Sequence, residues 1–468
     1  MVWYVAAGYR LPAGIEAYLL HYATEMRRHG FRTEILVFQP LPRVPHRYLQ
    51  ALQERGIRIR SLYDQCRWQV WGRVAATTLP WLVRALIRTR RLPRVGDWVV
   101  WQYKRCAVRR LARLIRREQP DIIHVKGRLI AEAWPVLPTG RTVYHHALSG
   151  TVDPSWTAAD VAAFRVFANR IARIFAPGQG VAATLAREFG LTRPVDALFA
   201  MAPDETRGAP RETTHERPET SDQRPQTRDR GQDETLDHRP ETIDQGNEME
   251  RSSSSQQRTD VYGLKSEVHG LRSNVCGLQS AVCGLRFGIL CRFTDQKGIA
   301  HILEALRMFR DTHGEADFTF AGQGPLEPAI REFARQHGLS RVRVCPVPSV
   351  PEVMQALDVF VHPGLDDAMP VSIVEALMFG VPCIATRVGG VPDLLRDGIE
   401  GILIAPGAAA PIHQAMARFA GLAAAEFQAY RERARARYVE VCRPAVVGAQ
   451  VARHYAAILS ATGVGRAA

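Results

Sequence analysis

The 468-residue sequence contains no run of eighteen apolar residues, so we expect no transmembrane helix. The N-terminus lacks the basic region and the longer apolar core of a secretory signal peptide, and residues 1–7 are read instead as a first strand. The eight cysteines form no CxxC pair, and none stands at metal-ligand spacing from a histidine. From these absences we expect a cytoplasmic protein with reduced thiols.

The formal net charge of +14 at pH 7 is unevenly distributed along the chain. Residues 204–285 hold 11 basic and 16 acidic residues, a net charge of −5, so the other 386 residues carry +19. Residues 67–117 concentrate much of this charge, with 14 basic residues against the single acid Asp97. Nucleic acid, an anionic membrane surface and acidic substrates are all candidate partners for such a segment.

Short apolar runs alternate with helical patterns in two parts of the chain, which predicts parallel sheets covered by helices on both faces. In the first part we expect a helix at 14–29 and strands at 2–7, 33–38, 121–125, 141–145 and 173–176. In the second part we expect strands at 287–291, 317–321, 341–345, 359–362 and 382–386, and helices at 298–312, 325–337, 351–357, 371–380 and 444–461. The predicted fold class is α/β, with two doubly wound, Rossmann-like domains.

The segment between these two parts has a different composition. Residues 206–258 are almost devoid of apolar residues, so they cannot bury enough surface to offset the entropy of ordering. Residues 261–285 then repeat every seven positions, as VYGLKSE, VHGLRSN, VCGLQSA and VCGL. We reject a coiled coil, because a glycine in each heptad costs about 1 kcal/mol in a helix.

A translated inverted DNA repeat explains this segment more simply. VCGL can be encoded by GTCTGTGGTCTG, whose reverse complement encodes RPQT when it is read one base in. RPQT stands at 224–227, and the related RPET stands at 217–220 and 239–242. We therefore interpret residues 204–285 as a low-complexity, disordered insert without a function of its own, tolerated because loop-closure entropy grows only logarithmically with length. The alternative is a genuine interaction linker.

The segment richest in candidate site residues, 358–407, reads DVFVHPGLDDAMPVSIVEALMFGVPCIATRVGGVPDLLRDGIEGILIAPG. Pro370 suits the first turn of the helix predicted at 371–380, because an N–H there has no intrahelical partner. The loop 366–369 before it then presents the backbone N–H groups of the helix N-terminus to an anion or a sugar oxygen.

Two acids, Asp367 and Glu375, flank this turn. Asp367 can accept hydrogen bonds from sugar hydroxyls, and Glu375 lies about 1.5 turns into the helix, on the face that can reach a ribose diol. Taken alone, the two could also be a surface acid and a charge interacting with the helix dipole.

The segment as a whole resembles the family-4 retaining glycosyltransferases of the GT-B fold, whose E-x7-E pattern matches Asp367 and Glu375. The resemblance covers most of residues 286–407, extends more weakly over 1–203 and skips the insert. It implies that Glu375 binds the nucleotide ribose and that Asp367, a glutamate in the family, contacts donor-sugar hydroxyls. The neighbouring backbone of Ala368, Met369 and Pro370 is expected to bind the donor.

A second motif, CRFTDQKG at 291–298, joins a predicted strand to a helix. Arg292 and Lys297 would converge on a diphosphate at the helix N-terminus, since a guanidinium fork and a compact ammonium both suit phosphate oxygens. The family shows a G-R…K-G pattern here and uses these cations to neutralise the leaving diphosphate. Cys291 replaces the glycine of that pattern. The alternative is a pair of solvated basic residues.

Three weaker motifs complete the candidate site. Gly322, in Gly-Gln-Gly-Pro after the next strand, matches a family G-x-G loop beside the nucleotide, although a plain turn is an equal alternative. Gly14 matches one glycine of the family's G-G-x-E, and Ala13 replaces the other. The family places a histidine near the C6 hydroxyl of the donor sugar after the strand at 141–145. There His145 and His146 leave the register open, and we favour His146.

The basic segment, Arg67–Arg117, interleaves arginines with tryptophan and aliphatic residues. This pattern suits an amphipathic surface on anionic lipid. An ordinary core helix with a solvated basic face is the alternative, and no nucleic-acid motif accompanies the charge.

The resemblance implies a hexosyltransferase that moves a sugar, with retention, from a UDP- or GDP-sugar to a hydroxyl. The acceptor would be a lipid-linked or surface-polysaccharide intermediate, and the enzyme cytoplasmic or peripheral on the inner face of the membrane. No cofactor or metal is expected, because Arg292, Lys297 and helix N-termini neutralise the diphosphate. A non-catalytic sugar-nucleotide binder, a GT-B epimerase and a membrane-surface scaffold remain alternatives.

The expected domains are an acceptor-binding domain at 1–203, the insert at 204–285, a nucleotide-sugar domain at 286–443 that faces the first across a cleft, and a C-terminal helix and tail at 444–468 that return to the first domain.

Overall fold

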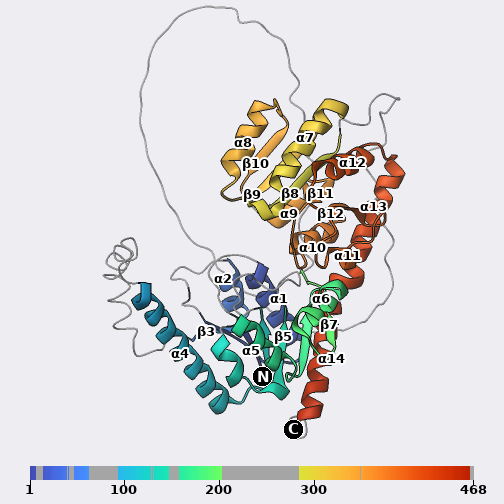
Figure 1. Cartoon of the computed structure of the whole chain (residues 1–468). Helices are drawn as coiled ribbons and strands as arrows, with labels where there is room; N and C mark the ends of the chain where they lie inside the picture. Colours follow the sequence, from blue (N-terminus) through green and yellow to red (C-terminus); the bar gives the residue numbers. More distant parts are fainter. Residues whose placement is uncertain are drawn as a thin grey trace, which may run out of the picture. The chain divides into compact units, whose positions relative to one another are not determined.

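The computed structural model describes residues 1–6, 14–38, 41, 47–62, 93–127, 129, 131–146, 158–202, 284–347 and 349–463 (Figure 1). Nearly all of the predicted insert lies outside these residues, as do Ala13 and residues 67–92 of the basic segment. The fold is described for the remainder, which contains two parallel sheets with helices around each.

The N-terminal sheet has seven strands among the described residues, in the order β3-β2-β1-β4-β5-β6-β7, and every neighbouring pair is parallel. The strands are β1 (Val2–Ala6), β2 (Thr33–Val37), β3 (Arg58–Ser61), β4 (Ile122–Lys126), β5 (Thr142–His145), β6 (Arg173–Ala176) and β7 (Val195–Ala197). The order reverses between β1 and β4, so the carboxyl ends of these two strands form a topological switch point, where doubly wound sheets bind ligands.

The C-terminal sheet follows the same plan with six strands in the described part of the chain, in the order β10-β9-β8-β11-β12-β13. The strands are β8 (Arg286–Arg292), β9 (Asp317–Gln323), β10 (Val342–Cys345), β11 (Val359–His362), β12 (Cys383–Thr386) and β13 (Gly401–Ile404). Its switch point lies between β8 and β11.

Helices cover both faces of each sheet, because successive side chains of a strand point to opposite faces. In β1, Trp3 and Val5 belong to one apolar core, and Tyr4 and Ala6 to another. The helices around the N-terminal sheet are α1 (Gly14–Arg28), α2 (Arg47–Glu54), α4 (Pro93–Glu118), α5 (Ala158–Ala168) and α6 (Gln179–Phe189). Those of the C-terminal part are α7 (Ile299–His313), α8 (Glu327–Gln336), α9 (Val350–Gln355), α10 (Val371–Met378), α11 (Val391–Leu394), α12 (Ala409–Ala420) and α13 (Ala424–Arg437).

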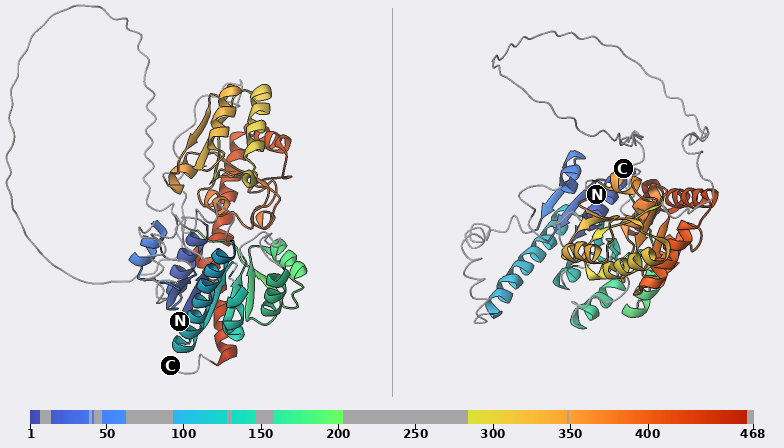
Figure 2. Two further views of the ribbon diagram at one scale, coloured as in Figure 1. Left: turned by 60° about the vertical axis from the view of Figure 1, so that its left-hand side comes forward. Right: turned by 90° about the horizontal axis from the view of Figure 1, so that it is seen from above.

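The last helix, α14 (Pro444–Thr462), packs on the N-terminal sheet rather than on the sheet that precedes it in sequence (Figures 1 and 2). Val447, Val451, Tyr455 and Ile458 recur at helical spacing and are buried in the same core as Val2, at the start of β1. The first and last elements of the described chain therefore share one core.

The expected fold class, two doubly wound parallel α/β sheets, is confirmed. Two local predictions are wrong by about one residue. Pro370 is the N-cap of α10, with an extended ψ of 119°, and does not occupy the first helical turn. Helix α7 begins at Ile299, after a 3-10 turn at Asp295–Lys297, and Gly298 is its left-handed N-cap. No helix in the described ranges is long and apolar enough to cross a bilayer.

Candidate functional site

Three loops meet at the switch point of the C-terminal sheet. The loop after β8 contacts the loop after β11 through Leu365 N–H, which donates to the Gln296 carbonyl at 2.8 Å. The loop after β12 contacts it too, since Thr386 Oγ1 donates to the Gly364 carbonyl at 2.5 Å and Gly390 N–H to the Ala368 carbonyl at 2.6 Å. Because these bonds tie the loops together, the predicted residues on them are held in one place.

Two glycines allow the backbone to pack closely at this edge of the sheet. Gly298 has φ +68°, and a Cβ there would overlap the carbonyl of Pro363 in the loop after β11. Gly322, a predicted site residue at the end of β9, has φ +151°, and a Cβ there would overlap the carbonyl of Cys291. Both positions therefore require glycine for packing, so the role of Gly322 beside a nucleotide stays a prediction.

Asp367 and Lys297, predicted from separate motifs, form an ion pair in this site. Lys297 Nζ donates to Asp367 Oδ2 at 2.5 Å, and the two side chains are 27% and 16% exposed. Burial raises the pKa of Asp367, but the nearby His362 and Lys297 outweigh it and lower that pKa to about 2. The carboxylate is therefore ionised at any physiological pH and can act only as a hydrogen-bond acceptor.

The third member of this group, His362, is one that the sequence analysis missed. It is the last residue of β11 and is 1% exposed, and its Nε2 lies 3.4 Å from Asp367 Oδ2. Neither ring nitrogen has a hydrogen-bond partner by geometry. A histidine that ends a switch-point strand, four residues after Asp358, was the available signal.

Arg292, the other predicted cation, ends β8 and is exposed. It stands on the strand beside β11, across the switch point from His362. Burial raises the pKa of the neighbouring Cys291 thiol to about 12. The cysteine is therefore a neutral, unreactive side chain in place of the expected glycine.

Helix α10 and the loop before it carry four more of the predicted donor-binding residues. Ala368 is half-buried, whereas Met369 and Pro370 are buried, and Met369 Sδ accepts a hydrogen bond from Ala200 N–H at 3.1 Å. Glu375 is half-buried in the middle of the helix. Helix α10 follows β11 directly, so its N-terminus lies at the same edge of the sheet as Asp367.

The N-terminal sheet contributes Gly14 and His146. Gly14 is the first residue of α1. His146 follows β5 and is 2% exposed; its Nδ1 lies 3.1 Å from the Tyr144 hydroxyl, whereas its Nε2 has no partner. Burial, with a smaller effect of Lys126, lowers the pKa of His146 to about 3, so the ring is neutral. His145, the alternative, is engaged differently, because its Nδ1 lies 2.7 Å from the Tyr18 hydroxyl.

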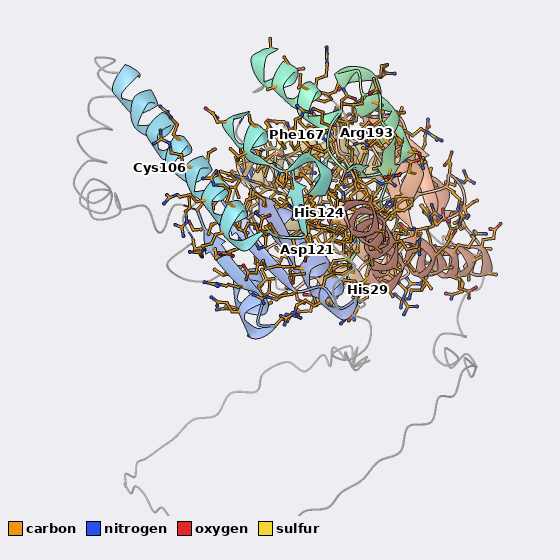
Figure 3. The ribbon with its side chains drawn as sticks, turned by 90° about the horizontal axis from the view of Figure 1, so that it is seen from below. His29, Cys106, Asp121, His124, Phe167 and Arg193 are labelled. Atoms are coloured by element: carbon orange, nitrogen blue, oxygen red, sulfur yellow. The ribbon has the colours of Figure 1, made fainter. Side chains whose placement is uncertain are left out.

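His124, in the middle of this half of the molecule, is part of the packing (Figure 3). Its Nε2 lies 2.9 Å from the Tyr18 hydroxyl, and its Nδ1 lies 2.5 Å from the hydroxyl of Tyr455 on α14. Burial, with a smaller effect of Lys126, lowers the pKa of His124 to about 3.

The described part of the basic segment is helix α4. Its C-terminal turns pack on the sheet through Ala107, Val108, Leu111, Leu114 and Ile115, whereas its N-terminal end projects beyond the sheet (Figure 2). Four arginines on the opposite side are exposed, namely Arg109, Arg113, Arg116 and Arg117. An ordinary amphipathic helix accounts for these features, and contact with lipid stays a prediction.

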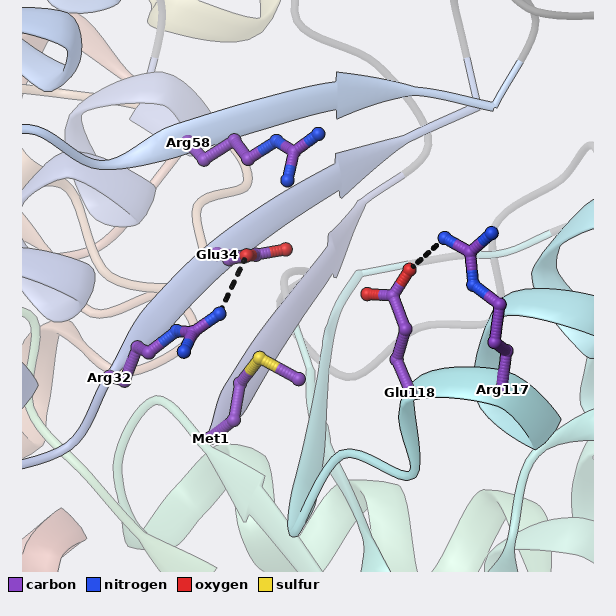
Figure 4. Close-up of a pocket in the computed structure, with 6 residues that line it drawn as sticks. All are labelled: Met1, Arg32, Glu34, Arg58, Arg117 and Glu118. Atoms are coloured by element: carbon purple, nitrogen blue, oxygen red, sulfur yellow. Dashed lines mark hydrogen bonds and ion pairs between the residues drawn. The ribbon is translucent and has the colours of Figure 1, made fainter.

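A separate cavity of about 460 Å³ lies at the other edge of the N-terminal sheet, at the amino ends of β1, β2 and β3 (Figure 4). Arginine and glutamate side chains line it, among them the ion pairs Arg32–Glu34, at 3.9 Å, and Arg117–Glu118, at 2.7 Å. It contains none of the predicted site residues. Within the described ranges, no group of three or more His, Cys, Asp or Glu residues could hold a metal ion.

Comparison with known proteins gives a family match within the C-terminal part of the chain. Residues 284–421 match the family described as glycosyl transferases group 1. A 2-deoxystreptamine glucosyltransferase of Streptomyces kanamyceticus is 30% identical over 135 residues, which are 28% of this chain and 35% of that protein. An amylovoran biosynthesis glycosyltransferase of Erwinia amylovora is 27% identical over 128 residues, 25% of this chain and 31% of that protein. The chain thus spans about a third of the length of these relatives.

Solved structures resemble nearly the whole chain. HepE of Anabaena, solved with UDP, superposes with a TM-score of 0.63 at 14% identity and covers 97% of this chain and 99% of that one. Sucrose-phosphate synthase of Thermosynechococcus elongatus superposes with a TM-score of 0.62 at 11% identity, covering 98% of this chain and 99% of that one. At such low identity these likenesses establish the fold, which is GT-B.

Proposed function

Because residues 284–421 match the family described as glycosyl transferases group 1, we propose that the chain is a hexosyltransferase acting on a nucleoside-diphosphate sugar. It transfers the sugar to an acceptor hydroxyl with retention at the anomeric carbon. The observation that carries the proposal is the ion pair of Asp367 and Lys297, which unites a sugar-binding acid and a phosphate-binding cation at one switch point.

Each residue has a role in the proposed reaction. Asp367 accepts hydrogen bonds from hydroxyls of the donor sugar, because its carboxylate is ionised. Lys297 and His362 both contact Oδ2, so among the described residues no ion pair engages Oδ1. Lys297 and Arg292 neutralise the departing diphosphate, so that the reaction needs no metal ion. Glu375 binds the ribose diol, and the backbone N–H groups at the N-terminus of α10 bind donor oxygens.

The acceptor proton leaves with the diphosphate in this proposal. Phosphate oxygen is a base within reach of the acceptor hydroxyl when both flank the anomeric carbon, so a separate protein base is not required. Gly14 and His146 lie at the same edge of their own sheet, and we assign them to the donor phosphate and the donor sugar respectively.

Uracil is the base we propose for the donor, which would be a UDP-sugar, with a GDP-sugar as the alternative. HepE is recorded with UDP and with UDP-glucose, and the shared fold supports the same base here. Amylovoran synthesis by a relative supports a lipid-linked or surface-polysaccharide acceptor. The exposed arginines of α4 would hold the protein peripherally on the inner, anionic face of a membrane.

A thermal-shift panel of UDP-, GDP- and ADP-sugars on wild type and Glu375→Ala tests this assignment. A ligand at 100 times its Kd stabilises the folded state by about 2.7 kcal/mol, which corresponds to a few degrees in Tm. We expect a UDP-sugar to give this shift in wild type and to lose it in Glu375→Ala, while Glu432→Ala, on an exposed part of α13, retains it.

The panel refutes the site if no nucleotide stabilises wild type more than Glu375→Ala. Release of UDP in the presence of a membrane extract then separates a transferase from a protein that only binds the donor. Product formed from the donor without any acceptor would identify an epimerase instead.

A further inference from the structure

Lysine is rare in this chain. Only four of its 61 basic residues are lysines, namely Lys104, Lys126, Lys265 and Lys297. Arginine is the usual basic residue of this chain, so a lysine at a strand end is unusual. It places a compact ammonium on a flexible side chain where arginine would place a planar guanidinium. Lys297 has a place in the proposed reaction, whereas Lys126 has none.

Lys126 is the last residue of β4, the strand on one side of the switch point in the N-terminal sheet. Its register partner on β5 is His145, so His146 follows at the same edge. Ligands of doubly wound sheets bind at this edge, beyond the carboxyl ends of the strands. Lys126 therefore occupies a position from which a side chain meets a ligand.

The surroundings of Lys126 are short of negative charge. Its Nζ donates to the His146 carbonyl at 3.3 Å and lies 3.9 Å from the centre of the Tyr18 ring. No carboxylate of the described residues lies within ion-pair distance of it. An ammonium has three N–H donors, and these contacts leave capacity for a further oxygen acceptor.

Lys126 is half-buried, and an ammonium without a nearby carboxylate has its charged form disfavoured. Burial lowers the pKa of Lys126 to about 7. Lys126 in turn contributes to the lowered pKa of His124, His145 and His146, after the effect of burial. A negative ligand oxygen placed beside Lys126 would stabilise its charged form.

His146 supplies an independent sign of a ligand. It is 2% exposed, and its Nε2 has no hydrogen-bond partner. Buried polar atoms in folded proteins are almost always paired, so an unpaired ring nitrogen near an ammonium with N–H donors to spare indicates a polar ligand group that both bind.

We propose that Lys126 and His146 bind an acidic group, a carboxylate or a phosphate, carried by one of the two substrates of the proposed sugar transfer. The inference rests on that function and narrows it to substrates with a negative charge outside the diphosphate. Lys126 is the primary contact, and His146 Nε2 donates or accepts the second hydrogen bond according to its tautomer.

Two matched pairs of probes distinguish the sources of the acidic group. UDP-glucuronate and UDP-glucose differ only in a carboxylate against a hydroxymethyl group on the donor sugar. Methyl glucuronide and methyl glucoside, added to protein saturated with UDP, present the same difference on the acceptor side. Calorimetric Kd values are measured for the full chain, for Lys126→Met and for Arg113→Met, which removes an exposed charge from α4.

We expect wild type and Arg113→Met to bind the charged member of one pair about tenfold tighter than its neutral partner, and Lys126→Met to lose that preference. The pair that shows this preference identifies whether the donor or the acceptor carries the acidic group. Preference for the neutral member, or an equal preference in Lys126→Met, overturns the proposal.

Folding and donor binding are controlled separately. Lys126→Gln replaces Lys126→Met if the methionine variant fails to fold, and it must lose the same preference. If wild type binds no UDP at all, the proposed function has failed. If wild type binds UDP but shows no Lys126-dependent preference in either pair, only this inference has failed.

Discussion

The ion pair between Lys297 and Asp367 supports a sharp prediction about stability. Asp367→Asn removes the charge of the carboxylate, Lys297→Met removes the cation that is paired with it, and the double variant removes both charges. In the absence of donor, these changes report only on the pair. Asp366→Asn, at the exposed neighbouring position, is the matched control.

The magnitude follows from the lowered pKa of Asp367. A fall from 3.8 to about 2 corresponds to roughly 2 kcal/mol of stability, at 1.36 kcal/mol for each pH unit. Because the folded-state pKa is below the unfolded value, this stability is fully present above about pH 4 and is lost as the pH falls through about 2. We expect Asp367→Asn to cost about 2 kcal/mol at pH 7, Lys297→Met about 1, and the double variant about 2.

Urea unfolding followed by circular dichroism measures these values. Tryptophan fluorescence is unsuitable for the C-terminal half, because no tryptophan lies beyond Trp156 in the sequence. Asp366→Asn should change the free energy of unfolding by less than about 0.5 kcal/mol. Additive losses in the double variant, or an Asp367→Asn loss that persists undiminished at pH 2.5, would refute the reasoning.

Two further predictions concern the backbone and the insert. Gly298→Ala should lower the free energy of unfolding by at least about 2 kcal/mol, because it adds a clash with the Pro363 carbonyl to the strain of a positive φ. Gly338→Ala, with φ +59° and open space around it, should lower it by only about 1 kcal/mol. Equal losses in urea unfolding would contradict this. Replacement of residues 209–279 by a short Gly-Ser linker should leave Tm within about 2 °C and UDP binding unchanged, since the segment has little apolar surface to bury; a loss of either would favour the interaction linker.

Most of the fold was predictable because both sheets are parallel and buried on both faces. Such strands appear as continuous apolar runs, and the runs at 2–7, 173–176 and 359–362 correspond to β1, β6 and β11. Strand β3 was missed because Arg58 and Arg60 interrupt its apolar pattern; Arg60 is nonetheless buried and paired with Glu34 at 2.8 Å. A buried ion pair across two strands gives no periodic signal in either strand.

The site was predictable where a local motif contained a residue type suited to the chemistry, as with the acid Asp367 and the cation Lys297. Their pairing was not, since 70 residues separate them and only the loop contacts bring them together. His362 was missed because a histidine at the end of an apolar strand is ordinary in sequence. Its significance comes from the distance to Asp367, which no local pattern contains.

The position of α14 bears on how the protein is made. Tyr455 of α14 and Val2 of β1 belong to the same core. Strand β1 therefore cannot complete its packing until the more than four hundred residues between it and α14 have been synthesised. Among the described residues, the cores of the C-terminal sheet use positions from 285 onward and a few around 199–202, so this sheet is free to form earlier. We therefore expect the C-terminal sheet to reach its native packing before α14 completes the core of the N-terminal sheet.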